Sequence, residues 1–258
     1  MKINPKKSLG QNFLIDKNII EKICNAANIS INDNVLEIGP GTGNLTEFIL
    51  LKKPKKFHVI EKDERLIKNL NQRFDDKITI INEDILKYDL KLLSDKDLII
   101  FGNLPYNISS QILTNFINYP YLEFSYKKLV FMFQKEVADR ILAKDNSKNY
   151  GRLSIFSSWK LNIKKIMDIN PSSFFPKPKV MSSLLIFEPK INYIKFKNSK
   201  NLEHITNVFF NQRRKMIKKP INILFKNSKT VIKDLNLDTN LRPQNLKKDT
   251  FYKICLIY

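Results

Sequence analysis

A glycine-rich turn and two carboxylates each follow a separate apolar run, and together they could hold a small polar ligand. The turn at residues 39–43 (Gly-Pro-Gly-Thr-Gly) follows the first run, Glu61 ends the second, and Asp84 comes shortly after the third. Glycine lets the backbone turn sharply and approach a ligand closely. An acid about 20 residues after such a turn is where Rossmann-like units bind ribose hydroxyls. These residues therefore predict a nucleoside site at the carboxyl edge of a sheet.

The spacing of the glycines narrows the choice of ligand. A dinucleotide-binding loop has the pattern G-x-G-x-x-G, but Asn44 stands where the last glycine would be, so the pattern here is G-x-G-x-G. This favours a ligand without a pyrophosphate, and Asp84 could accept a hydrogen bond from an adenine amino group. We therefore predict S-adenosylmethionine as the cofactor. Taken singly, the turn could be only structural, and each acid could be a solvated or helix-capping residue.

A second motif follows the fourth apolar run, where residues 97–101 lead into Gly102-Asn103-Leu104-Pro105-Tyr106. Asn and Pro are common in turns, so an N-x-P-Y sequence could be no more than a turn. Beside a cofactor loop, however, it resembles the N-P-P-Y signature of methyltransferases that act on amino nitrogens of bases.

The chemistry of an amino group explains why these residue types would be needed. A methyl group on a sulfonium is already activated, whereas the amino lone pair of adenine is delocalised into the ring, so the enzyme must mainly align the attack. We hypothesise that the Asn103 side-chain carbonyl and the Leu104 backbone carbonyl accept the two amino hydrogens. Pro105 lacks an N–H and would fix the turn. This arrangement needs no strong base.

Aromatic residues are expected to hold the target base after it leaves its stack. Tyr106 would stack on one face of the base and Phe174 on the other, and such stacking is worth ~1–3 kcal/mol per base. Phe174 could instead be a core residue, but the neighbouring Pro176 and Pro178 favour a rigid, exposed loop.

The elements that must position these residues alternate between strand and helix. This alternation is typical of βαβ units and a mainly parallel sheet. We therefore expect an α/β fold, with a Rossmann-like methyltransferase domain and a mainly parallel seven-stranded sheet over residues 1–190. Short basic helices, broken at Pro220 and Pro243, would form a small helical domain over residues 191–258. The expected strands are residues 34–38, 57–61, 77–81, 97–101, 128–134, 163–169 and 180–187.

The charge of the chain suggests a polyanionic partner. The 258 residues carry a formal charge of +20, although a compositional bias toward Lys, Asn and Ile could explain much of it. The excess is uneven: residues 191–258 hold 15 basic and 4 acidic residues, against 30 and 21 in residues 1–190. We predict that a basic helix with Arg213 and Arg214 contacts phosphates, unless it is only a solvated face. Cations that could add contacts around the site are Lys6, Lys7, Lys177 and Lys179.

Several protein classes are disfavoured. No uncharged apolar run approaches the ~18–20 residues of a membrane span, and the N-terminus lacks the apolar segment of a signal peptide. Cys24, Cys255, His58 and His204 are the only cysteines and histidines and have no metal-ligand spacing, so we expect neither zinc nor a His-based triad. We therefore expect a cytoplasmic protein without a metal or a membrane partner.

Six motifs appear in order along the chain: residues 7–14 (KSLGQNFL), 37–43 (EIGPGTG), 101–109 (FGNLPYNIS), 134–137 (QKEV), 150–154 (YGRLS) and 174–180 (FFPKPKV). Together they resemble the small-subunit ribosomal RNA adenine dimethyltransferase family. The resemblance implies that S-adenosylmethionine methylates N6 of two adjacent adenosines in the loop of the 3′-terminal helix of 16S ribosomal RNA, giving N6,N6-dimethyladenosine. It further implies a monomer that acts on pre-30S particles during ribosome biogenesis.

The same resemblance implies roles for single residues. Asn12 and Leu14 would close over the cofactor, and Gly39 would contact it. Glu61 would hold the ribose of the cofactor and Asp84 its adenine. Asn103 would lie beside the reactive end of the cofactor, where the target base arrives.

The sequence leaves other functions open. Large-subunit adenine methylases of the macrolide-resistance type share most of these motifs, although the block at residues 150–154 and Leu104 look more like the small-subunit branch. A DNA adenine methylase is a related alternative. A non-catalytic ribosome-assembly factor with the same fold is a third, against which the intact motifs at residues 37–43 and 103–106 argue.

Overall fold

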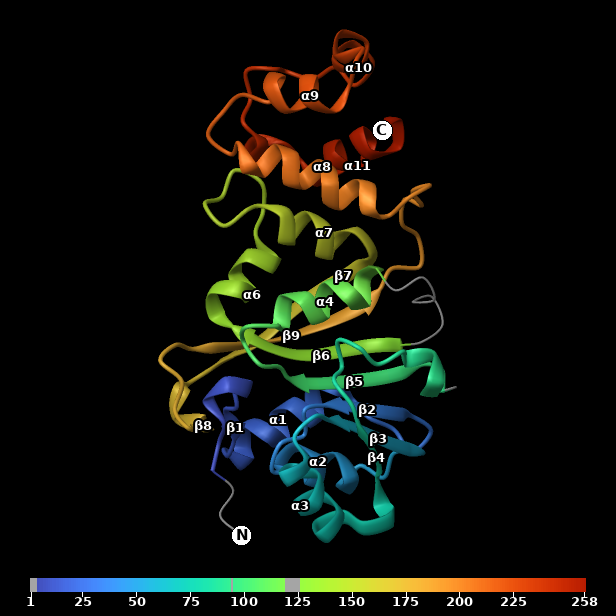
Figure 1. Ribbon diagram of the computed structural model, residues 1–258, viewed down its shortest axis with the longest axis vertical. Helices are drawn as coiled ribbons and strands as arrows, with labels where there is room; N and C mark the ends of the chain where they lie inside the picture. Colours follow the sequence, from blue (N-terminus) through green and yellow to red (C-terminus); the bar gives the residue numbers. More distant parts are fainter. Residues whose placement is uncertain (1–3, 94, 119–125) are drawn as a thin grey trace. The chain divides into compact units, whose positions relative to one another are not determined.

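A computed structural model describes residues 4–93, 95–118 and 126–258 (Figure 1). The chain forms two compact units. Unit 1 comprises residues 1–138 and 162–189, and unit 2 comprises residues 139–161 and 190–258.

Unit 1 is built on a seven-stranded sheet with the order β4-β3-β2-β5-β6-β9-β7. The first five strands in this order pair in parallel, and β9 is antiparallel to β6. The predicted Rossmann-like, mainly parallel sheet is therefore confirmed. The strand bounds are β2 (Asn34–Ile38), β3 (Lys56–Glu61), β4 (Thr79–Asn82), β5 (Leu98–Asn103), β6 (Tyr126–Gln134), β7 (Leu161–Ile169) and β9 (Ser182–Pro189).

Helices follow the parallel strands, and local sequence signals mark where two of them begin. The Asp16 side chain accepts hydrogen bonds from two N–H groups in the first turn of α1, and the Asp63 side chain accepts one from the N–H of Arg65 in the first turn of α3. Four buried residues spaced three or four apart fasten α1 to the core: Ile20, Ile23, Cys24 and Ala27. The helix bounds are α1 (Lys17–Ala27), α2 (Asn44–Leu51), α3 (Glu64–Phe74), α4 (Ser109–Asn118) and α6 (Lys135–Leu142).

A two-stranded antiparallel sheet joins the N-terminal segment to the segment before β9. It consists of β1 (Phe13–Leu14) and β8 (Phe174–Phe175), which lie side by side at the left of Figure 1. Leu14 is paired with Phe174, and both side chains belong to the hydrophobic core of unit 1. The pairing therefore fixes the N-terminal segment to the main sheet's core.

Unit 2 is helical, and its boundary differs from the predicted one at residue 190. Residues 139–161 belong to this unit, although the sequence analysis placed them in the first domain. The reason is that the buried aromatic face of α7 packs with the C-terminal segment: Trp159 stacks on Phe196, and Tyr252 donates a hydrogen bond to the Ile155 carbonyl at 2.8 Å. The helices are α7 (Arg152–Lys160), α8 (Lys200–Asn211), α9 (Lys218–Leu224), α10 (Ser228–Asp234) and α11 (Lys248–Ile257).

Candidate active site

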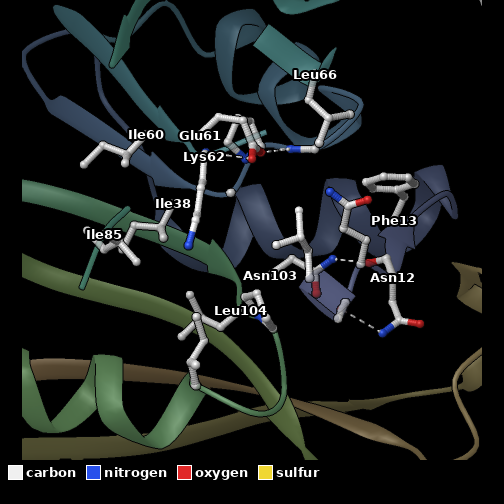
Figure 2. A pocket seen from close by; sticks show the side chains of 18 of the residues that line it. Asn12, Phe13, Ile38, Ile60, Glu61, Lys62, Leu66, Ile85, Asn103 and Leu104 are labelled. Carbon is white, nitrogen blue, oxygen red and sulfur yellow. Dashed lines mark hydrogen bonds between the residues drawn. The ribbon is translucent and has the colours of Figure 1, made fainter. Parts of the chain in front are cut away.

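A cavity of about 250 Å³ opens in unit 1 where the parallel strands end. The residues that follow β2, β3, β4 and β5 line it, together with the N-terminal residues 8–14 (Figure 2). Open α/β sheets bind ligands at this edge because the strands deliver side chains and loops from several elements to one place. Among the predicted cofactor and reaction residues, the lining includes Asn12, Leu14, Gly39, Glu61, Asp84, Asn103, Leu104, Pro105 and Tyr106.

The glycine turn after β2 lines the cavity with backbone atoms, because its glycines have no side chains. Gly39 and Gly41 have φ angles of 65° and 61°, which L side chains rarely adopt. A Cβ on Gly41 would lie 2.8 Å from Cδ1 of Phe13, whereas no atom lies within 4 Å of the corresponding position on Gly39. The turn thus packs against β1 at one glycine and leaves space for a ligand at the other.

Glu61 is held in place by backbone donors at the end of β3. Its side chain is only 7% exposed, and its Oε1 accepts hydrogen bonds from the N–H groups of Lys62 and Asp63, both at 2.8 Å. Its Oε2 accepts the N–H of Gly41 at 3.3 Å. Burial raises the pKa of Glu61. Because an ionised carboxylate has about four acceptor positions, this network orients Glu61 and leaves capacity for a ligand hydroxyl.

Asp84 lies beyond β4 and is already paired on one side. Its Oδ1 accepts the N–H of Leu86 at 3.0 Å, and its Oδ2 lies 2.8 Å from Nζ of Lys62. The hydrogen bond from Lys62 lowers the pKa of Asp84, so this carboxylate is ionised at neutral pH. Sequence reasoning missed Lys62, which follows Glu61 directly and lines the same cavity.

Glu37 is a buried acid beneath the glycine turn. Its side chain is 2% exposed and accepts a hydrogen bond from Oγ1 of Thr46 at 2.7 Å. Burial, and to a smaller extent the nearby Glu61, raises the pKa of Glu37 to about 8. The site therefore holds one acid that is mainly protonated at pH 7 close to a second, backbone-bound acid.

Asn103 at the end of β5 has its amide group oriented by the N-terminal segment. Its Nδ2 donates a 2.7 Å hydrogen bond to the backbone carbonyl of Asn12, as Figure 2 shows. Since the nitrogen is used in this way, Oδ1 is left as the acceptor of the side chain. Leu104, which follows, has a fully buried side chain, so its side chain anchors the motif while its backbone lines the cavity.

The N-terminal segment is fastened over the cavity by further side chains that the sequence analysis did not single out for this role. Asn44 donates from Nδ2 to the Leu14 carbonyl at 2.8 Å, and Gln11 donates to Oδ2 of Asp63 at 3.0 Å. Asn44 occupies the position where a dinucleotide-binding loop has its last glycine. Its side chain therefore links the glycine turn to the N-terminal segment, which a glycine at this position could not do.

The two predicted stacking residues differ in their surroundings. Tyr106 lines the cavity, its Oη lies 2.7 Å from Oγ of Ser182, and burial raises its pKa. Phe174, in contrast, is 3% exposed, belongs to the core and does not line the cavity. The expectation that Phe174 lies on an exposed loop is therefore wrong. Strand alternation places its neighbour Phe175, 55% exposed, on the open face instead.

The sequence predicts a helix for the basic run of residues 211–219, but most of this run forms a turn. Only its ends are helical, with Asn211 in α8 and Lys218 and Lys219 in α9. Residues 212–217 form the turn between α8 and α9, because α8 ends at Asn211. Arg213 donates from Nε to Oε1 of Gln244 at 3.2 Å and from its guanidinium to the carbonyl of Lys148. It therefore ties three segments of unit 2 together. The exposed cations of the run are Arg214, Lys215, Lys218 and Lys219.

Two further findings concern the described ranges only. In residues 4–93, 95–118 and 126–258, no helix combines the length and apolar character needed to cross a membrane. In the same ranges, no cluster of three or more His, Cys, Asp or Glu side chains has a geometry that could hold a metal ion.

Comparison with known proteins gives the family. A family model described as ribosomal RNA adenine dimethylase matches residues 2–258. A protein of Pelagibacter ubique named ribosomal RNA small subunit methyltransferase A is 57% identical over 258 residues, which cover 100% of this chain and 98% of that protein. A protein of Ehrlichia canis with the same name is 39% identical over 260 residues, covering 98% of this chain and 97% of the other.

Solved structures agree with this result. The crystal structure of a dimethyladenosine transferase from Plasmodium falciparum matches with a TM-score of 0.81 and 29% identity, covering 95% of this chain and 96% of the other. The 23S rRNA methyltransferase ErmE matches with a TM-score of 0.71 at 20% identity, covering 94% and 98%, which supports the fold alone. The family and the cofactor predicted from the sequence are thus confirmed. The chain belongs to the ribosomal RNA adenine dimethylase family of S-adenosylmethionine-dependent methyltransferases.

Proposed function

We propose that this enzyme transfers methyl groups to N6 of two adjacent adenosines in the loop of the 3′-terminal helix of small-subunit ribosomal RNA, giving N6,N6-dimethyladenosine. The high identity to small-subunit methyltransferases over the full chain supports this substrate. The observation that carries the chemistry is the orientation of Asn103. Because its amide nitrogen is bound to the Asn12 carbonyl, its oxygen is available as an acceptor in the cavity.

The residues of the cavity fit S-adenosylmethionine, which supplies an activated methyl group when it is bound. The open backbone at Gly39 admits a ligand, and the remaining acceptor position of Glu61 suits a ribose hydroxyl. Asp84, ionised and held by Lys62, suits the amino group of an adenine. Apolar side chains of the lining, Ile38, Ile60 and Ile85 among them, suit the face of its ring (Figure 2).

In this proposal the substrate amine is aligned by acceptors, not by a base. Oδ1 of Asn103 and the carbonyl of Leu104 accept hydrogen bonds from its two N–H groups, which leaves the nitrogen lone pair free to attack. The nitrogen would take up the methyl group that the bound cofactor supplies, and one of its protons would pass to solvent. Pro105 holds the turn between Leu104 and Tyr106. Tyr106 stacks on the base, and its bond to Ser182 limits the rotation of its ring. Asn12 and Leu14 close over the cofactor as part of the N-terminal segment.

The RNA around the target loop is proposed to contact unit 2. The exposed cations Arg214, Lys215, Lys218 and Lys219 suit phosphates, and Arg213 supports the turn that carries two of them. We further propose that the enzyme acts as a monomer on pre-30S particles in the cytoplasm, where ribosomal RNA is assembled with protein.

Methyl transfer from radiolabelled S-adenosylmethionine tests this function. We expect label in immature small subunits, with mass spectrometry giving N6,N6-dimethyladenosine at two adjacent positions. Matched reactions contain large subunits or naked DNA and should remain unlabelled. Label confined to large subunits or to DNA would contradict the proposed substrate, and binding without any label would contradict catalysis.

A further inference from the structure

We propose that the segment from Phe175 to Met181 is a docking surface for the single-stranded RNA beside the target adenosine, with Phe175 as the platform on which a neighbouring base stacks. This inference rests on the proposed function, because it concerns the RNA that the cavity would receive. We call residues Phe175, Lys177, Lys179, Val180 and Met181 the stacking ridge; all five are exposed.

The pairing of β1 with β8 determines which way Phe175 points. Phe13 lies opposite Phe175, and Leu14 lies opposite Phe174. Opposite residues of an antiparallel pair project from the same face. Leu14 and Phe174 are core residues, so Phe13 and Phe175 share the other face, and there Phe13 packs against Gly41 of the glycine turn. Phe175 therefore stands beside the wall of the cavity with more than half of its side chain exposed.

The charges of the ridge favour RNA as its partner over a protein with an apolar surface. Lys177 and Lys179 are exposed, and neither forms an ion pair within the ranges that the structure describes. No acidic residue occurs from residue 169 to residue 187. Exposed aromatic and apolar side chains alternating with unpaired cations provide what a single strand needs, since bases stack on the former and phosphates bind the latter.

The ridge is continuous with the residues that would hold the target base. Ser182 follows Met181 directly, and its Oγ lies 2.7 Å from Oη of Tyr106. The carbonyl of Met181 also accepts the N–H of Lys135 at 2.8 Å, which fixes the end of the ridge to the main sheet's β6–α6 junction. The Met181 end of the ridge therefore directly precedes the serine that contacts Tyr106, the residue proposed to stack on the target base.

The chemistry of the reaction gives such a platform a purpose. When the target adenosine leaves its stack, the next base loses a stacking partner, and this raises the free energy of the open form. An aromatic face outside the cavity replaces the lost partner. Since the proposed product has two modified adjacent adenosines, the platform could hold one of them while the other occupies the cavity.

A fluorescent RNA tests the platform. The probe is a hairpin of the small-subunit 3′-terminal helix with 2-aminopurine beside the target adenosine, because stacking quenches this base. Wild-type protein should quench the probe. Phe175→Ala should abolish the quenching and weaken RNA affinity roughly 5- to 150-fold, which is the range for one stacked base. Phe175→Trp should restore both the quenching and the affinity.

Lys177→Gln and Lys179→Gln should each flatten the log–log salt dependence of RNA binding by about 0.7, because each variant loses one phosphate contact.

Matched controls lie at the opposite edge of the sheet, where Leu51→Ala and Lys55→Gln remove an exposed apolar group and an exposed charge. Both should bind RNA as wild type does. Unchanged affinity for S-adenosylmethionine, measured by calorimetry, shows that a variant is folded. Wild-type quenching and affinity in Phe175→Ala overturn the platform but leave the proposed function standing, provided that the wild-type enzyme methylates small-subunit RNA. A defect seen with intact particles but not with naked RNA overturns it in favour of a protein partner.

Discussion

The cavity of unit 1 and the basic turn of unit 2 use polar side chains in opposite ways. In the cavity, Glu61 and Asn103 are oriented by backbone groups, and few of their hydrogen-bonding positions remain open. In the turn, Arg214 and Lys215 are exposed. Alignment of a methyl transfer depends on fixed geometry, because small displacements lower the rate steeply. Attraction of phosphates depends on charge and tolerates mobile side chains. The two regions should therefore respond differently to substitution.

The largest effect is expected for Asn103→Ala. It removes the side-chain acceptor of the substrate amine, so methyl transfer in a single turnover should slow by roughly 100- to 1000-fold, the range for one lost transition-state contact. RNA affinity should change little. Asn32→Ala, an exposed site at the other edge of the sheet, is the matched control. A turnover rate within a few-fold of wild type would remove Asn103 from the reaction.

Glu61→Gln should have the next largest effect and should act on the cofactor alone. The variant loses the charge that strengthens the hydrogen bond to a ribose hydroxyl, so S-adenosylmethionine should bind roughly 10- to 100-fold more weakly by calorimetry. Glu64→Gln, an exposed acid three residues later, should bind it normally. Equal affinities in the two variants would mean that Glu61 only braces the glycine turn.

Substitutions at Arg213 and Arg214 compare a hydrogen-bonded cation with an exposed cation inside the basic turn. Arg214→Gln should flatten the salt dependence of RNA binding by about 0.7 and leave stability unchanged. Arg213→Gln should instead destabilise unit 2 by ~1–2 kcal/mol, because the contacts with Gln244 and Lys148 are lost. The fluorescence of Trp159, the only tryptophan and a buried residue of this unit, can follow urea unfolding. The reverse pattern would assign Arg213 to the RNA contact.

The parts of the site that could be predicted are those fixed by strand order. Glu61, Asp84 and Asn103 each follow a strand of a parallel sheet, so a sequence that shows the strands also brings these residues to one edge. The parts that failed depend on tertiary packing. Phe174 and Phe175 are adjacent in β8, so their side chains point to opposite faces. Only the register of β8 against β1 decides which of them is buried. Similarly, α7 joins unit 2 through aromatic contacts with residues far along the chain, which no local pattern reveals.

The smallest effect concerns stability and the buried acid Glu37, whose folded-state pKa of about 8 lies above its ordinary value of 4.5. Between these values the folded protein holds a proton that the unfolded chain has released. Since stability falls with rising pH wherever the folded state binds more protons, the contribution of Glu37 should decline from about pH 4.5 to about pH 8 and then level off. Glu37→Gln removes this titration but keeps an acceptor for Thr46. The difference between wild type and variant in urea unfolding, followed by circular dichroism at several pH values, should show that slope. A difference that does not vary with pH would mean that folding does not raise the pKa of Glu37.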